Sequence, residues 1–497
     1  MTDRAFSLLR TVLFPVLSTL RRRAGGESLP VAPHHGIPAL HLGGVILERR
    51  SVRDVGPAES LIADTMYGGI YEFGGVKVEA LPDDVFACSA PGPAWKSGLL
   101  RMDWLAGFRT SGRALHGLFA LRLLACWMKT RPARLSRADQ TAQLFNLALH
   151  APAIAGTQSP AAIALATAAI LRAQHPVNRL KVATPRDAFE RSKALLAAHL
   201  ATRQGDSQRT RLVADLEQAL SSLLHVDGSL VTGSVDDLCN VDADLTVLTD
   251  GLSKAGDGLP PGLVALRGRM SACLALLTRP DGTLAFAETA DLQASRPASP
   301  VPACAIAPHA GHARLSCGQT VLIAALASPG QAAPFRAEMS DAGRPLLWLE
   351  RTGDRQKGHG SLICATGGTL LEINGAGQMA DRQHIALFLS GDGSDLRLED
   401  LSSGHRTTCY VLHVPDQTRL STTHGGTGAM IVPATGHSWQ LLVRGARVEM
   451  EQGFLRVFPE TGPAQGFNLA LKRTAKPERA ARLAKTRGGD AGTPRLL

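Results

Sequence analysis

The chain has 497 residues, of which 44% are hydrophobic and 19% are charged. This length is too great for one compact core, so at least two structural units are expected, and the composition excludes a chain that is disordered throughout. No apolar run reaches the roughly 18 residues of a membrane-spanning helix, which excludes a polytopic membrane protein.

The net charge of +10 is concentrated at the two ends of the chain. Residues 472–497 hold eight basic and two acidic side chains, and residues 1–24 hold five basic and one acidic, so the body between them is close to neutral. A nucleic-acid partner is therefore not predicted. Residues 472–497 are predicted to form a disordered basic tail.

The N-terminal segment, residues 1–30, combines an apolar run with basic flanks. Residues 11–20 match the apolar core of a signal peptide in length, but Arg10 precedes them, Arg21 follows them and no small-residue cleavage site is present. A signal peptide is therefore not predicted, and both the cytoplasm and the cell envelope or periplasm stay open as compartments. The eight cysteines contain no Cys-x-x-Cys pair and lie among apolar residues, so we expect buried free thiols, a pattern that favours a reducing compartment.

Residues 31–295 are predicted to form a helical domain. Apolar residues recur at helical spacing in residues 113–130, 159–174, 210–228 and 260–282. The last two segments end in similar turns, one with Asp-Gly at 227–228 and the other with Asp-Gly at 281–282. Repeated helical hairpins of this kind are typical of an α/α toroid or solenoid.

Residues 296–471 are predicted to form an antiparallel β-sandwich, which makes the fold class multidomain, α then β. A linker rich in Pro, Ala and Ser spans residues 291–313. Beyond it, turns rich in Gly, Asp and Asn separate short apolar runs. The expected strands are residues 320–327, 345–351, 360–366, 369–375, 385–391, 410–414, 429–434, 440–445, 446–450 and 454–458.

Seven segments carry a family signature in order along most of the chain. They are residues 66–75, 93–108, 144–154, 223–230, 309–330, 335–340 and 358–365, which include a Trp-rich stretch, an Asn-x-x-x-His helix and an Asp-Gly turn. Together they resemble the heparinase II/III-like family, in particular a divergent bacterial branch found beside envelope-polysaccharide genes. The resemblance implies an α/α toroid followed by a β-sandwich, and a polysaccharide lyase.

The implied activity is cleavage of an acidic, uronate-containing polysaccharide by β-elimination. Such a lyase neutralises the sugar carboxylate, removes the adjacent proton and protonates the leaving oxygen. Asn146 and His150 share one face of a predicted helix, and His359 aligns with the family's sandwich-domain histidine, so these three are the predicted catalytic residues. The predicted substrate-binding residues, in a cleft between the two parts, are Arg355, Lys357, Trp104 and Trp95.

Each of these assignments has a structural alternative. Asn146 can instead bond a neighbouring loop, and His150 can end its helix. His359 can be a surface-loop residue, and the two tryptophans can be core residues because apolar residues flank them.

The chain also departs from the family pattern. Ala106 stands where the branch has a histidine, Leu147 stands beside the helix asparagine in place of a tryptophan, and His312 replaces a tyrosine. None of the three tyrosines, Tyr67, Tyr71 and Tyr410, lies at the position expected for a catalytic tyrosine. The alternative hypothesis is therefore a catalytically degenerate protein that binds polysaccharide during envelope or exopolysaccharide assembly.

No cofactor is predicted, because no phosphate-binding loop, dinucleotide fingerprint or closely spaced zinc motif is present. The alternative is a structural zinc ion in the sandwich, held by His405 or His413 together with Asp395. The expected partner is an acidic polysaccharide.

Overall fold

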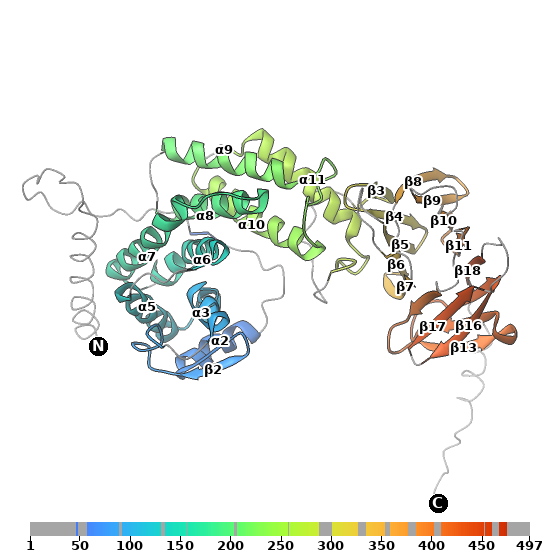
Figure 1. Ribbon diagram of the computed structural model, residues 1–497, viewed down its shortest axis with the longest axis horizontal. Coiled ribbons are helices and arrows are strands. Elements are labelled where there is room, and N and C mark those ends of the chain that lie inside the picture. Colours follow the sequence, from blue (N-terminus) through green and yellow to red (C-terminus); the bar gives the residue numbers. More distant parts are fainter. Residues whose placement is uncertain are drawn as a thin grey trace, which may run out of the picture. The chain divides into compact units, whose positions relative to one another are not determined.

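The computed structural model describes residues 46–47, 57–88, 92–130, 135–156, 158–202, 206–256, 258–287, 301–326, 334–352, 358–375, 384–401, 409–451, 453–459 and 467–474. The chain divides into two compact units. The first extends to residue 268 without residues 226–230 and 234–236, and the second holds those two short segments and the chain from residue 269. The first unit is mainly helical, and the second contains the β-sandwich (Figure 1).

The helices and the small hairpin come first along the chain. They are α2 (Pro57–Tyr67), β1 (Ile70–Phe73), β2 (Val76–Glu79), α3 (Pro93–Leu100), α4 (Leu105–Ser111), α5 (Ala114–Lys129), α6 (Arg137–Gly156), α7 (Pro160–Asn178), α8 (Pro185–Thr202), α9 (Asp206–Leu223), α10 (Val235–Lys254) and α11 (Pro261–Leu277). Five of these helices begin with proline, whose fixed φ suits the first helical position. The four helices predicted from periodicity are confirmed as α5, α7, α9 and α11. None of the helices in the described ranges has the length and hydropathy that a bilayer crossing requires.

The two predicted Asp-Gly turns have the same local structure. Asp227 Oδ1 accepts hydrogen bonds from the backbone nitrogen (3.1 Å) and hydroxyl (2.6 Å) of Ser229. Asp281 Oδ1 accepts the equivalent pair from Thr283, at 2.9 and 2.7 Å. The glycine that follows each aspartate has a positive φ, which few other residues adopt. The similarity of the two turns, which the sequence predicted, is therefore confirmed by their hydrogen bonds.

The second unit contains two antiparallel eight-stranded sheets. One has the order β13-β14-β15-β18-β11-β10-β9-β8, and the other β16-β17-β12-β7-β6-β5-β4-β3. The strands are β3 (Cys304–Ala307), β4 (His312–Cys317), β5 (Thr320–Ala325), β6 (Arg336–Asp341), β7 (Arg344–Thr352), β8 (Gly358–Ala365), β9 (Gly368–Gly375), β10 (His384–Ser390), β11 (Asp395–Asp400), β12 (Cys409–His413), β13 (Arg419–Thr423), β14 (Gly428–Val432), β15 (Trp439–Arg444), β16 (Ala446–Glu451), β17 (Phe454–Pro459) and β18 (Phe467–Arg473). Alternate residues face the core, as in β10, where Ile385, Leu387 and Leu389 are buried.

The sandwich is larger than the sequence predicted. All ten expected strands are present, but β3 and the start of β4 lie within the predicted linker. Three further strands, β6, β11 and β13, were not predicted. Strand β18 extends through Arg473, so the first two residues of the predicted tail belong to the sheet. Residues 1–30 and the tail from residue 475 onward lie outside the described residues.

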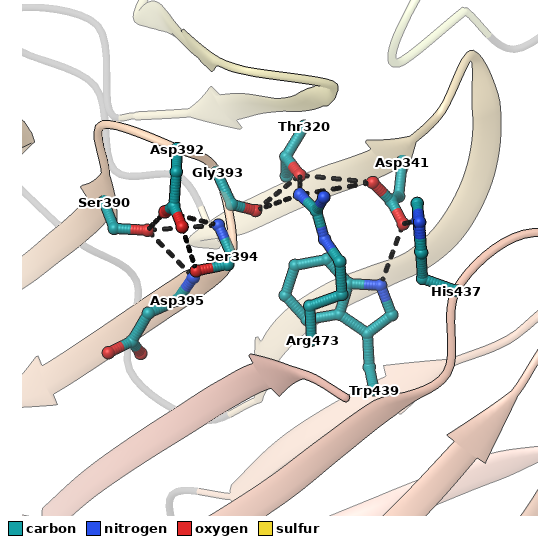
Figure 2. Close-up of polar contacts among 10 residues, drawn as sticks. All are labelled: Thr320, Asp341, Ser390, Asp392, Gly393, Ser394, Asp395, His437, Trp439 and Arg473. Carbon is teal, nitrogen blue, oxygen red and sulfur yellow. Dashed lines mark hydrogen bonds and ion pairs between the residues drawn. The ribbon is translucent and has the colours of Figure 1, made fainter. Parts of the chain in front are cut away.

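A buried polar network joins the two sheets (Figure 2). The carboxylate of Asp341, on β6, lies 3.0 Å from His437 Nδ1 and accepts a hydrogen bond from Trp439 Nε1 at 3.1 Å. Arg473, on β18, lies 3.7 Å from the other oxygen of Asp341 and donates to the hydroxyl of Thr320 at 3.0 Å. Because Asp341 is buried, these partners replace the water that its charge would otherwise require.

Candidate functional site

A pocket with a volume of about 440 Å³ lies in the helical unit. Helices α6, α8 and α10 form its walls, together with the segment before α4 and the loop before α8. Its lining is strongly charged. The charged lining residues are Arg101, Asp103, Arg137, Lys181, Arg186, Asp187, Glu190, Arg191, Lys193 and Asp244.

Asn146 is the one predicted catalytic residue that lines this pocket. Its amide nitrogen donates to the carbonyl oxygen of Arg101 at 2.9 Å and to the carboxylate of Asp103. An amide nitrogen has two hydrogens, so both are used within the protein. In this structure, Asn146 therefore bonds a neighbouring loop, as in the structural alternative given above.

Lys193 is a buried cation at the pocket that the sequence analysis missed. Its ammonium lies 2.7 Å from Asp244 and 2.5 Å from Glu190, and 4.6 Å from the ring centre of Phe145. Burial alone lowers the pKa of Lys193, but the two carboxylates outweigh burial and raise it above its usual value. Lys193 therefore stays charged and holds α8 against α10.

A signal for Lys193 was present in the sequence. Phe189, Leu196 and Leu200 are buried on α8 and recur with Lys193 at helical spacing. A lysine within an apolar stripe is rarely buried without a partner. Its partner Asp244, however, is 51 residues away in the sequence.

Two other pocket cations have no carboxylate partner among the described residues. Lys181 is exposed in the loop before α8, and Arg191 donates to the backbone oxygens of Val177 (3.3 Å) and Asn178 (3.0 Å). Lys and Arg at such positions can bind the carboxylates or sulfates of an acidic ligand.

The described structure does not place the other predicted catalytic residues, His150 and His359, at this pocket. His150 lies one turn after Asn146 on α6, is buried, and is not among the described residues that line the pocket. His359 lies on β8, where its backbone pairs with Asn374 of β9, and its side chain is outside the described part of the structure. Arg355 and Lys357 lie outside the described residues.

The two tryptophans that were predicted to bind substrate are core residues in this structure. Trp95 is 1% exposed and donates its indole hydrogen to the Tyr71 carbonyl at 3.2 Å. Trp104 is 2% exposed and donates to the Leu99 carbonyl at 2.9 Å. Protein atoms cover both rings, so in this structure neither ring presents a face to a sugar.

Two of the three tyrosines are also buried. Burial raises the pKa of Tyr71 to about 12 and, with a contribution from Asp400, raises that of Tyr410 well above its usual value. Such hydroxyls stay protonated at neutral pH. Tyr67 is exposed at the end of α2, where its ring packs against His116.

Two residues of the zinc alternative, His413 and Asp395, lie in the described part of the sandwich. His413 stacks on Trp348, and Asp395 forms an ion pair with Arg397 at 2.6 Å. Among the described residues, no group of three or more His, Cys, Asp or Glu side chains is arranged to hold a metal ion. His405 lies outside the described residues.

Comparisons with known proteins identify the fold. No family model and no curated protein matches the sequence. Among solved structures, a heparinase III matches with a TM-score of 0.64 and 11% identity over 88% of this chain and 87% of that chain. A mutant of the heparan sulfate lyase HepC from Pedobacter heparinus matches with a TM-score of 0.62 and 10% identity over 86% and 84%. The chondroitin lyase ODV-E66, a baculovirus envelope protein, matches with a TM-score of 0.50 and 10% identity over 84% and 83%.

These structural similarities, at 10–11% sequence identity, establish the fold alone. The chain has the heparinase III-like arrangement of an N-terminal α/α toroid followed by an antiparallel β-sandwich. The fold class predicted from the sequence is therefore confirmed, as is the resemblance to heparinase-like lyases at the level of fold.

Proposed function

We propose that this chain, which has the fold of the heparinase III lyases, is a polysaccharide lyase that cleaves a uronate-containing glycan of the cell envelope or an exported glycan by β-elimination. The observation that carries the proposal is the charged pocket at Asn146 in the helical unit. Lys181 and Arg191, the two pocket cations without a carboxylate partner in the described part of the chain, match the negative charge of such a glycan.

The proposed chemistry assigns one task to each catalytic residue. Asn146 hydrogen-bonds the uronate carboxylate and stabilises the negative charge that develops when the neighbouring proton leaves. To do so, its amide must exchange the hydrogen bond to Asp103 for one to the substrate. His150 and His359 are the proposed groups for proton transfer.

The proposed substrate-binding residues change accordingly. Arg355 and Lys357 remain proposed contacts for the acidic sugar, and Lys181 and Arg191 join them. Trp95 and Trp104 are left out, because their rings are buried.

A second candidate function is polysaccharide binding without cleavage. Two observations favour it. The Asn146 amide is already used by Arg101 and Asp103, and two of the three tyrosines, Tyr71 and Tyr410, are buried with raised pKa values.

Ultraviolet absorbance distinguishes the two functions, because β-elimination creates a carbon–carbon double bond conjugated with the carboxylate. The purified full-length protein is mixed with a panel of uronic-acid polysaccharides. For a lyase, absorbance rises with time and the rise is lost in His359→Ala and Asn146→Ala. His384→Ala, on β10 of the same sheet, is the matched control and keeps the activity.

Binding to the same panel tests the pocket separately. Lys181→Glu with Arg191→Glu is expected to weaken binding at least tenfold, while Arg211→Glu, an exposed residue of α9 outside the pocket, leaves it unchanged. Binding that depends on the pocket, without any rise in absorbance, supports the second function. Binding that is unaffected by the double substitution refutes the pocket as the glycan site.

A further inference from the structure

Three cysteines meet at one open edge of the sandwich. Strand β3 is the edge of one sheet and β8 is the edge of the other. The two strands approach within 8 Å between Cα atoms, and Figure 1 shows them at the same end of the sandwich. Cys304 lies on β3, Cys317 on the neighbouring β4, and Cys364 on β8.

Strand register shows that all three thiols are on inward faces. Cys304 pairs with Leu315, which is fully buried, and Cys317 is two residues further along the same strand and therefore shares its face. On the other sheet, Cys364 pairs with Thr369, which is also buried. The two sheets thus turn their cysteines toward each other.

The side chains converge on Thr369. Its hydroxyl oxygen lies 3.2 Å from Cys304 Sγ and 3.7 Å from Cys317 Sγ. Cys364 is the cross-strand partner of Thr369, and its thiol interacts with the thiol of Cys304. The thiols of Cys304 and Cys364 are therefore direct neighbours across the gap between the sheets.

The cluster is also accessible, contrary to the expectation of buried thiols. All eight cysteines are free, but only Cys126, Cys239 and Cys273 are buried, whereas Cys364 is exposed. Cys304 is partly exposed. An oxidant in solution can therefore reach Cys364 first, with a second thiol in contact behind it.

We propose that Cys304 and Cys364 are a reversible oxidation site, which forms a disulfide that links the edge strands of the two sheets. With a peroxide as oxidant, the Cys364 thiolate attacks the peroxide oxygen to give a sulfenic acid and releases hydroxide or water. The Cys304 thiol then displaces water from the sulfenic acid, and the S–S bond forms. With a small disulfide such as oxidised glutathione, two exchange steps give the same bond and two reduced thiols.

Two consequences distinguish this site from an ordinary surface cysteine. Burial and the neighbouring Cys304 raise the pKa of the Cys364 thiol, so the thiolate fraction and the oxidation rate rise as the pH increases above neutral. The bond also closes a loop of about 60 residues, so oxidation raises the melting temperature of the sandwich and reduction restores it.

The test uses the full-length protein treated with oxidised glutathione or hydrogen peroxide. Peptide mass spectrometry without reduction is expected to find the Cys304 and Cys364 peptides joined, with a loss of two hydrogens. The joined peptide and the rise in melting temperature are absent from Cys304→Ser and from Cys364→Ser. Both persist in Cys409→Ser, which changes a partly exposed thiol on β12.

Three results overturn the proposal. The first is a bond between Cys304 and Cys317 in place of the predicted one. The second is a Cys364 that carries only glutathione or a sulfonic acid while Cys304 stays a free thiol. The third is the absence of any joined Cys304 and Cys364 peptide after either treatment.

Discussion

Replacing His312 with glutamine is expected to make the sandwich less sensitive to acid. His312 begins β4, and its ring stacks on Phe286 with 5.4 Å between ring centres. Its Nδ1 atom is buried and has no hydrogen-bond partner among the residues that the structure describes. Burial lowers the pKa of His312 to about 4, although the carboxylate of Asp227 acts in the opposite direction.

The size of the effect follows from the difference between the folded and unfolded states. In the unfolded chain a histidine has a pKa near 6.5, so between about pH 6.5 and about pH 4 the unfolded state binds a proton that the folded state does not. The stability contribution of neutral His312 is therefore present above pH 6.5 and is lost as the pH falls. Between about pH 7 and about pH 5, the loss from this residue is about 2 kcal/mol.

The assay compares the free energy of unfolding of the wild type and His312→Gln at both pH values. Urea unfolding is followed by hydrogen exchange of β4 and β5, which reports on the sandwich alone. The lost stacking on Phe286 is independent of pH, and other titrating groups are common to both proteins. We expect the stability difference to shift by about 2 kcal/mol in favour of the variant at the lower pH. An unchanged difference would refute the conclusion that His312 is held neutral.

Two further predictions concern stability. Gly228→Ala is expected to lower the free energy of unfolding by about 3 kcal/mol, because φ is +83° and a Cβ would lie 2.1 Å from the Arg269 carbonyl oxygen. Gly282→Ala is the matched control, since φ is +88° but a Cβ there would meet no described atom within 4 Å. Urea unfolding should show a loss of about 1 kcal/mol for this control. Equal losses would contradict the steric argument. Lys193→Met is expected to cost about 3–5 kcal/mol in thermal unfolding of the helical unit, because it leaves Asp244 without its cation, and adding Asp244→Leu should recover most of the loss. If the second substitution recovers nothing, the ion pair is not the cause.

The parts of the fold that were predicted have strong local periodicity. Helices α5 and α7 carry long apolar stripes, and β10 alternates buried and partly exposed residues along its whole length. Patterns of this kind are set by the face that a segment buries, so they can be read without knowledge of its partners. The Asp-Gly turns were found for the same reason, since each is closed by hydrogen bonds within a few residues.

The parts that were missed have weak or misleading local patterns. Strand β3 is four residues long and lies in a Pro-rich segment that resembles a linker. Strand β11 alternates correctly, but all its residues except Leu396 and Leu398 are charged. Strand β18 ends in Lys472 and Arg473, whose charges made the sequence resemble a tail.

The sequence predicted only the part of the candidate site that lies on a single helix. Asn146 and its place on α6 could be inferred from local spacing. The contacts that define its environment are long-range, from Asn146 to Asp103 and from Lys193 to Asp244, and no local pattern encodes such pairs.

The position of β18 has a consequence for the order in which the sandwich is completed. It is the last described strand in the chain, yet it lies in the interior of its sheet, between β15 and β11. Without it, these two strands have no hydrogen-bonded link, and each presents a free edge. During synthesis, residues 467–473 leave the ribosome after all the other described strands of the sandwich. Until β18 is available, the nascent chain therefore carries two parts of an incomplete sheet, each with an open edge. During this interval, pairing of these edges with another chain competes with folding.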